Sequence, residues 1–392
     1  MSGPLPLAPR PHDDEALSSW VLRLAARYDL AAGDFIRYLL GGRRIAPGPL
    51  GRLDYLADAK VEAALAAAAR IDVARIRRLR IAGDDGRSVS WYRASPARCP
   101  ACMREDLAER GEVYLRATWR LGCHAVCPVH GILLCDTCCR CGENSRCGFR
   151  CVDGRLRLAC LVCQRVVDPE TPEICRNAQL NDTRSGVFGV SVTPRLVRLV
   201  GELQGDVHAA LAGLRPWRHQ RSARSLATMV RDLAASLIRA VGIKVEPPFE
   251  AFEVLDRWGE GTLAAVEPAS LAILAPRGAY EVLAIVAAVL DRPGTRTRPE
   301  CVWRPIGQGG PVTKIDMVSL VGSLPPRERE RLRAKAAAWE AGAGAHSQRC
   351  LAALEAALRS DAEAPLERGR LGRQVGQRPS RDTTVAFGSG FA

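Results

Sequence analysis

Cysteine clustering is the feature that most constrains this chain: twelve of its fifteen cysteines lie between Cys99 and Cys163. The opening residues lack the pattern of a signal peptide, and no window holds the roughly 20 consecutive apolar residues that a membrane span needs. We therefore expect a cytoplasmic protein without membrane association. Because disulfides are rare in that reducing compartment, metal ligation is the leading interpretation of the cluster.

Four pairs of metal-ligand residues, each separated by two residues, occur within the cluster. Such spacing lets both members of a pair reach one tetrahedral zinc ion, and two pairs complete its four ligands. The first predicted site has three cysteines and one histidine: Cys99, Cys102, Cys127 and His130. The second predicted site is of the zinc-ribbon type and has four cysteines: Cys138, Cys141, Cys160 and Cys163.

Five further cysteines leave the ligand register of the second site open at this stage. Cys135 paired with Cys138, or Cys147 paired with Cys151, would also have ligand-like spacing. Each spare thiol taken singly is better interpreted as a small buried apolar group. The spare cysteines in the segment are Cys123, Cys135, Cys139, Cys147 and Cys151.

Two zinc sites with four protein ligands each predict structural ions, because a catalytic zinc keeps one position open for water or substrate. Nucleobase deaminases also use a Pro-Cys-x-x-Cys pair, but here Pro100 follows Cys99 and the upstream His-x-Glu is missing. No nucleophile, base and orienting group form a recognisable pattern elsewhere. We therefore expect a protein that is not an enzyme.

Helical periodicity dominates the chain on either side of the cysteine-rich segment. Residues 1–87 begin with an amphipathic stripe formed by Leu17, Trp20, Val21, Leu24 and Tyr28. The acids Asp13, Asp14 and Glu15 are interpreted as favourable charges at the start of that helix. Asp72 is expected to cap a later short helix.

The cysteine-rich segment, residues 88–176, shows little helical periodicity and is expected to be a separate tandem zinc module. Residues 177–362 are predicted to form a helical domain, with Leu226, Val230, Leu233, Leu237 and Val241 on one helix face. Residues 363–392 are expected to be a basic disordered tail. The predicted fold class is thus mainly α.

Positive charge indicates an acidic polymer as partner. The formal net charge is +13, from 56 Lys and Arg against 43 Asp and Glu, and most of the cations are arginine, which suits phosphate. An arginine-favouring genome, or a solvated helix face, would produce the same pattern. The candidate nucleic-acid-binding residues are Arg75, Arg77, Arg78, Arg116 and Arg120.

Four segments together resemble the TniQ (TnsD) family of bacterial transposition proteins. They are LPLAPRPHDDEALSSWVLRLA, ARCPACMRED, YLRATWRLGCHAVCPVHGILLCDTCCRCG and LACLVC, and they span roughly residues 4–165. One departure is Cys139, where the family commonly has proline between the two cysteines.

The resemblance implies a non-catalytic adaptor that selects the target site and recruits a transposition ATPase and a transposase or integrase. It also implies an N-terminal helix-turn-helix and tandem zinc fingers. Some relatives bind target DNA directly and others bind a CRISPR effector complex, and the sequence leaves that choice open, as it does a homodimer. The alternatives are a zinc-dependent transcription regulator without transposition partners and, more remotely, a thiol redox protein.

Overall fold

The structure is a computed structural model, and it describes twelve stretches of the chain. They are residues 4–42, 50–55, 58–81, 91–93, 97–142, 147–167, 189–190, 192–212, 223–241, 270–291, 317–339 and 345–362. These residues form mostly helices and one two-stranded sheet, with cysteine-rich clusters around residues 99–163. The predicted, mainly α fold class is confirmed.

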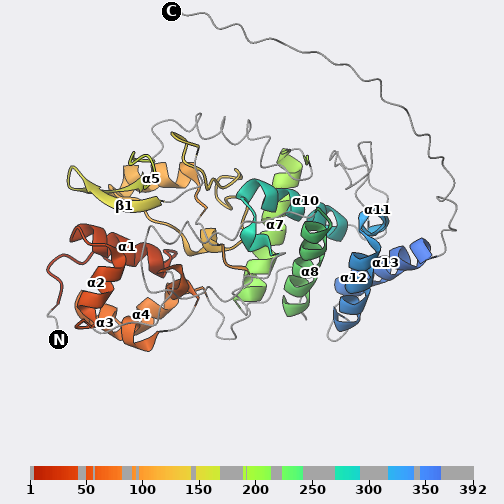
Figure 1. Ribbon diagram of the computed structural model, residues 1–392, viewed down its shortest axis with the longest axis horizontal. Helices are drawn as coiled ribbons and strands as arrows, with labels where there is room; N and C mark the ends of the chain where they lie inside the picture. Colours follow the sequence, from red (N-terminus) through yellow and green to blue (C-terminus); the bar gives the residue numbers. More distant parts are fainter. Residues whose placement is uncertain are drawn as a thin grey trace, which may run out of the picture.

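The N-terminal helices surround one hydrophobic core, in the red and orange part of Figure 1. Leu17, Trp20, Val21 and Leu24 are buried on one face of the first helix, so the predicted stripe is confirmed over these residues. Tyr28, its last predicted member, is half-buried and caps the end of the helix. Asp72 caps its helix as expected, accepting a hydrogen bond of 2.8 Å from the amide of Ala74. The elements are α1 (Leu17–Arg27), α2 (Ala32–Leu39), η1 (Leu50–Asp54), α3 (Ala59–Ala69) and α4 (Val73–Arg78).

The interpretation of the three adjacent acids as charges at the start of α1 is wrong. Ala16 is the N-cap residue of α1, and the first turn contains no acidic residue. The acids lie on the chain before the helix, where arginines reach them. Asp13 pairs with Arg75, Asp14 pairs with Arg116, and Glu15 is buried beside Arg23.

The cysteine-rich segment contains a regular helix that its sequence did not indicate. Helix α5 (Pro100–Arg110) begins directly after Cys99, its N-cap residue. Pro100 occupies the first turn, where its fixed φ favours a helix and its missing N–H costs nothing. The 3-10 helix η3 (Ala117–Arg120) follows, and β1 (Cys147–Val152) pairs with β2 (Arg155–Cys160) as an antiparallel hairpin.

Long helices form the C-terminal half of the described chain, in green to blue in Figure 1. The predicted stripe from Leu226 to Leu237 is buried, whereas Val241 is half-buried. No described helix is both long and apolar enough to span a bilayer. The tail, residues 363–392, lies outside the described residues. The elements are α7 (Pro194–Leu211), α8 (Ala223–Val241), η4 (Leu271–Ile273), α10 (Pro276–Asp291), α11 (Met317–Ser323), α12 (Pro326–Trp339) and α13 (Ala345–Ala362).

The cysteine-rich segment and the C-terminal helices share one hydrophobic core. Gln204 of α7 is buried, accepts hydrogen bonds from the amides of Ala125 and Val126, and donates one of 2.6 Å to the Val126 carbonyl. At Gly122, a Cβ would lie 2.6 Å from the backbone nitrogen of Ala272, so only glycine allows this approach. The two parts therefore pack as closely as elements within a domain.

Candidate metal centres

The first cluster brings together the four side chains predicted as its ligands. Their ligand atoms all lie within 4.8 Å of one another. Nδ1 of His130 is 3.3 Å from Sγ of Cys102 and 3.6 Å from Sγ of both Cys99 and Cys127. Cys99 and Cys102 come from the start of α5, and Cys127 and His130 from a turn closed by the bond from the Gly131 amide to the Cys127 carbonyl.

These distances match the edges of a zinc tetrahedron. With Zn–S bonds of about 2.3 Å and Zn–N bonds of about 2.0 Å, tetrahedral geometry places two sulfurs about 3.8 Å apart and a sulfur about 3.5 Å from a nitrogen. The Cys102 and Cys127 sulfurs are 3.5 Å apart. The donor set of three sulfurs and one imidazole is the set that zinc prefers, so the residues fit a zinc ion.

Hydrogen bonding prepares this cluster for a cation. The Cys102 thiol lowers the pKa of Cys127, whereas the same contact raises the pKa of Cys102. The thiolate is the form of cysteine that ligates metal. Burial lowers the pKa of His130, but its hydrogen bonds to Glu105 and Cys127, together with the negative charges of those two groups, raise the pKa overall.

The second cluster lies at the open end of the β1–β2 hairpin and fits a zinc ion equally well. Sγ of Cys138 is 3.8 Å from that of Cys163, and Sγ of Cys141 is 3.8 Å from that of Cys160. The hairpin register pairs Cys147 with Cys160 and thereby fixes the second CxxC pair. The backbone amide of Arg165 bonds to the Cys163 sulfur and lowers its pKa.

The spare cysteines of this segment stay outside both clusters. Cys123, Cys135 and Cys147 are buried, and burial raises the pKa of the Cys123 thiol to about 12. Cys147 lies 3.7 Å from a guanidinium nitrogen of Arg98, and Cys151 is exposed. The sequence left the ligand register of the second cluster open, and in the structure the four cysteines that come together are Cys138, Cys141, Cys160 and Cys163.

Comparison with known families assigns the N-terminal third of the chain. The TniQ family matches residues 6–134, which include the N-terminal helices and all four residues of the first cluster. The chain carries a TniQ domain. The expected family is confirmed over these residues, and at the level of the family the domain links the chain to transposition. A search of curated proteins finds no match.

A buried ion network joins α1 of the TniQ domain to the residues that follow α5. Arg23 and Glu15 are both fully buried, and their side chains meet at 2.7 Å. Burial raises the pKa of Glu15, although the positive charge of Arg23 opposes this effect. Arg23 also binds Glu112, which follows α5. The network fixes α1 against the helix that carries two candidate ligands.

The five candidate nucleic-acid arginines of the TniQ domain occupy different environments. Arg116 binds both carboxylate oxygens of buried Asp106 and stacks on the ring of Trp119, 4.8 Å from its centroid. Arg120 is buried and pairs with Asp54 at 3.2 Å. Arg75 and Arg77 pair with carboxylates of Asp13 and Glu62. Among the described residues, only Arg78 of this set is exposed without an ion pair.

Glu105 acts on the first cluster, although the sequence did not indicate it. The carboxylate of Glu105 accepts a hydrogen bond of 2.9 Å from Nε2 of His130, which leaves Nδ1 facing the sulfurs. Carboxylates commonly orient metal-binding histidines in this way. The available signal was the position of Glu105 one turn after Cys102 on α5, and it required knowledge that this segment is helical.

Proposed function

We propose that the chain is a non-catalytic adaptor that selects the target site for a transposon and recruits its transposition machinery. The single observation that supports the proposal most is the TniQ match, because it covers the N-terminal helices and the first cluster together. Each cluster offers four candidate side-chain ligands, so an ion bound by all four would lack an open position for substrate or water. Such ions suit a structural role.

Zinc is the ion that we propose for both clusters. A Cys₃His set and a Cys₄ set favour zinc over harder cations, which prefer oxygen ligands. In the folded chain the first ion would tie α5 to the turn at Cys127, and the second would tie the base of the hairpin to the segment before it. The proposed ions therefore hold α5 and the β1–β2 hairpin in fixed positions.

Recruitment requires a target and a partner. We propose target DNA, or a DNA-bound complex such as an RNA-guided CRISPR effector, on one side, and the ATPase and transposase or integrase of the element on the other. The N-terminal helices are the proposed helix-turn-helix-like part. An excess of thirteen positive charges supports contact with nucleic acid on at least one of these routes.

Co-purification tests the adaptor role. The full zinc-loaded chain is expected to retain the ATPase encoded by the same element, in the presence of target DNA and nucleotide. A single cluster variant, Cys99→Ser, serves as the control because it removes one proposed zinc ligand of the matched domain. If the wild-type chain retained neither the ATPase nor the transposase, the proposal would be contradicted. A stand-alone DNA-binding regulator would then be the explanation.

A further inference from the structure

The β1–β2 hairpin has one packed face and one arginine face. Phe149, Leu156 and Leu158 are buried on the packed face. The hairpin lies beside α1 in Figure 1, and Phe149 and Leu158 share a hydrophobic cluster with residues of that helix. Because side chains alternate along a strand, the residues between them point the other way. The register places Arg150 directly opposite Arg157, and Arg155 opposite Val152, on that second face. We call Arg150, Arg155 and Arg157 the ribbon arginines.

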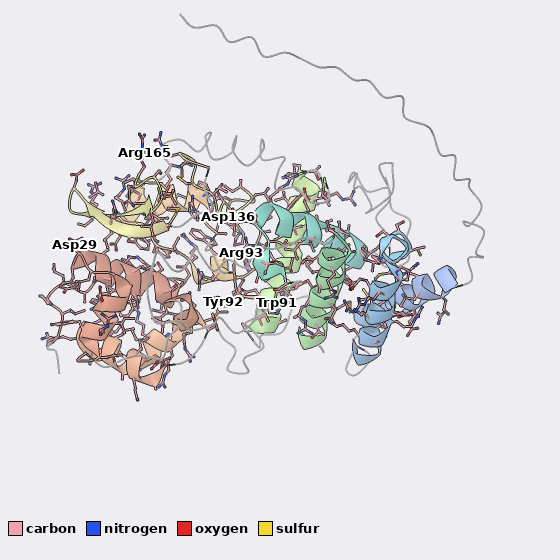
Figure 2. The ribbon with its side chains drawn as sticks, viewed as in Figure 1. Asp29, Trp91, Tyr92, Arg93, Asp136 and Arg165 are labelled. Carbon is pink, nitrogen blue, oxygen red and sulfur yellow. The ribbon has the colours of Figure 1, made fainter. Side chains whose placement is uncertain are left out.

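Two of the ribbon arginines are exposed without a carboxylate partner. Within the described part of the chain, Arg150 and Arg155 have no ion pair and no side-chain hydrogen bond. Arg165, beside the second cluster, is also exposed and unpaired, and its side chain points outward in Figure 2. Three arginines of the TniQ domain differ from them, since Arg23, Arg116 and Arg120 all bind buried carboxylates.

Arg157, which lies opposite Arg150, is half-buried and makes an interaction of its own. Arg150 and Arg155 are therefore the exposed cations of this face, and a polyanion would neutralise their charge. Arginine is suited to this role, since its planar guanidinium binds phosphate oxygens in pairs.

We propose that the two exposed ribbon arginines, Arg150 and Arg155, bind the phosphate backbone of duplex DNA together with Arg165. A two-stranded ribbon fits the major groove of B-DNA, which is about 12 Å wide. The deep and narrow major groove of duplex RNA does not admit such a ribbon. Contacts of this kind position a protein on DNA without reading its sequence. The inference rests on the proposed function only in taking target DNA as a partner.

The salt dependence of DNA binding by the full zinc-loaded chain tests the role of these arginines. The test variant is Arg150→Gln with Arg155→Gln, and the matched control is Arg37→Gln with Arg359→Gln, which removes the same charge from exposed, carboxylate-paired sites. The probe is a labelled 30-base-pair DNA of random sequence, measured by fluorescence anisotropy between 50 and 200 mM salt. Zinc content is measured for every variant.

Losing two phosphate contacts should lower the slope of log affinity against log salt by about two, because each contact contributes about 0.9. The affinity deficit of the test variant relative to wild type should then shrink about tenfold across this salt range. The control should keep the wild-type slope and zinc content, and duplex RNA of the same sequence should bind more weakly than DNA.

Three results would contradict the proposal that these arginines bind duplex DNA. They are an equal slope for test and control variants, a loss of zinc that accompanies the loss of binding, and tighter binding to RNA than to DNA. In each case, continued co-purification with the transposition ATPase would support the adaptor role and would contradict only DNA binding by the hairpin arginines. Loss of both properties in wild-type protein would contradict the two proposals together.

Discussion

Nε2 of His130 lies 2.9 Å from Oε1 of Glu105, so one helix supplies two of the first cluster's candidate ligands and also orients a third. Cys99 and Cys102 stand at the start of α5, and Glu105 follows one turn later. The hydrogen bond selects the tautomer in which Nδ1 faces the sulfurs. Helix α5 is thus the element on which the first centre depends.

Removal of the Glu105 carboxylate is expected to weaken the first centre. Glu105→Ala should lower zinc affinity there by about tenfold or more, since the partners of metal-binding histidines typically contribute this much. Chelator-induced zinc release measures the effect. Glu109→Ala is the matched control, because Glu109 is an exposed carboxylate on the same helix outside both clusters. Equal zinc release from both variants would show that Glu105 does not stabilise the first centre.

Elemental analysis of purified wild-type protein should give about two zinc ions per chain, one for each four-ligand set. Cys99→Ser and Cys160→Ser should each lose at least one ion and should unfold more readily, because structural zinc contributes on the order of 10 kcal/mol of folding free energy. Cys151→Ser should keep both ions, since Cys151 is exposed and outside the clusters. Folded wild-type protein with no zinc would refute this assignment.

Local patterns explain why much of this arrangement could be predicted. The spacing within each CxxC or CxxH pair is a property of adjacent residues, and the stripe from Leu17 to Leu24 repeats with the period of a helix. Both signals are readable without the fold. Trp20, which the sequence places on that stripe, is fully buried.

Relations between distant residues explain what the sequence could not indicate. Asp54 and Arg120 meet only after folding, and the Ser18 hydroxyl completes that buried site with a bond of 2.6 Å. Arg120 therefore looked available for phosphate although a carboxylate neutralises it. Helix α5 was missed because cysteines and charged residues replace the apolar repeat, while Pro100 and the cluster define its start.

Breaking the buried pair in the TniQ domain should be costly. Arg23→Met leaves Glu15 buried without its cation, and we expect a loss of about 3–5 kcal/mol in the free energy of unfolding. Adding Glu15→Gln should recover much of that loss. Arg27→Met is the control, because Arg27 is partly exposed and its pair with Glu112 should contribute below about 1 kcal/mol. Urea unfolding with zinc present measures all three, and similar losses for Arg23 and Arg27 would contradict the network.

His124 should make stability depend on pH. Burial, followed by the neighbouring His208 and Arg93, lowers its pKa to about 3, and neither ring nitrogen has a hydrogen-bond partner among the described residues. A lowered histidine pKa means that stability is complete above the unfolded value of about 6.5 and is lost as the pH falls. From pH 7.5 to 5.5 the loss should be about 1 kcal/mol.

His124→Phe should therefore flatten the dependence of unfolding free energy on pH without weakening the protein at pH 7.5. His208→Phe is the comparison, because burial also lowers the pKa of His208 although this residue is only partly buried. Chemical unfolding at a series of pH values measures both variants. A slope unchanged by His124→Phe would show that His124 does not titrate as its environment implies.

Sequencing of insertion junctions tests target selection most directly. The element is reconstituted with its transposase and ATPase, with and without the zinc-loaded chain, on the same target DNA. Our account predicts that omission of the chain abolishes insertion or redistributes it over other sites, while cleavage at the ends of the element continues. Identical insertion frequency and an identical distribution of sites in the two reactions would contradict it.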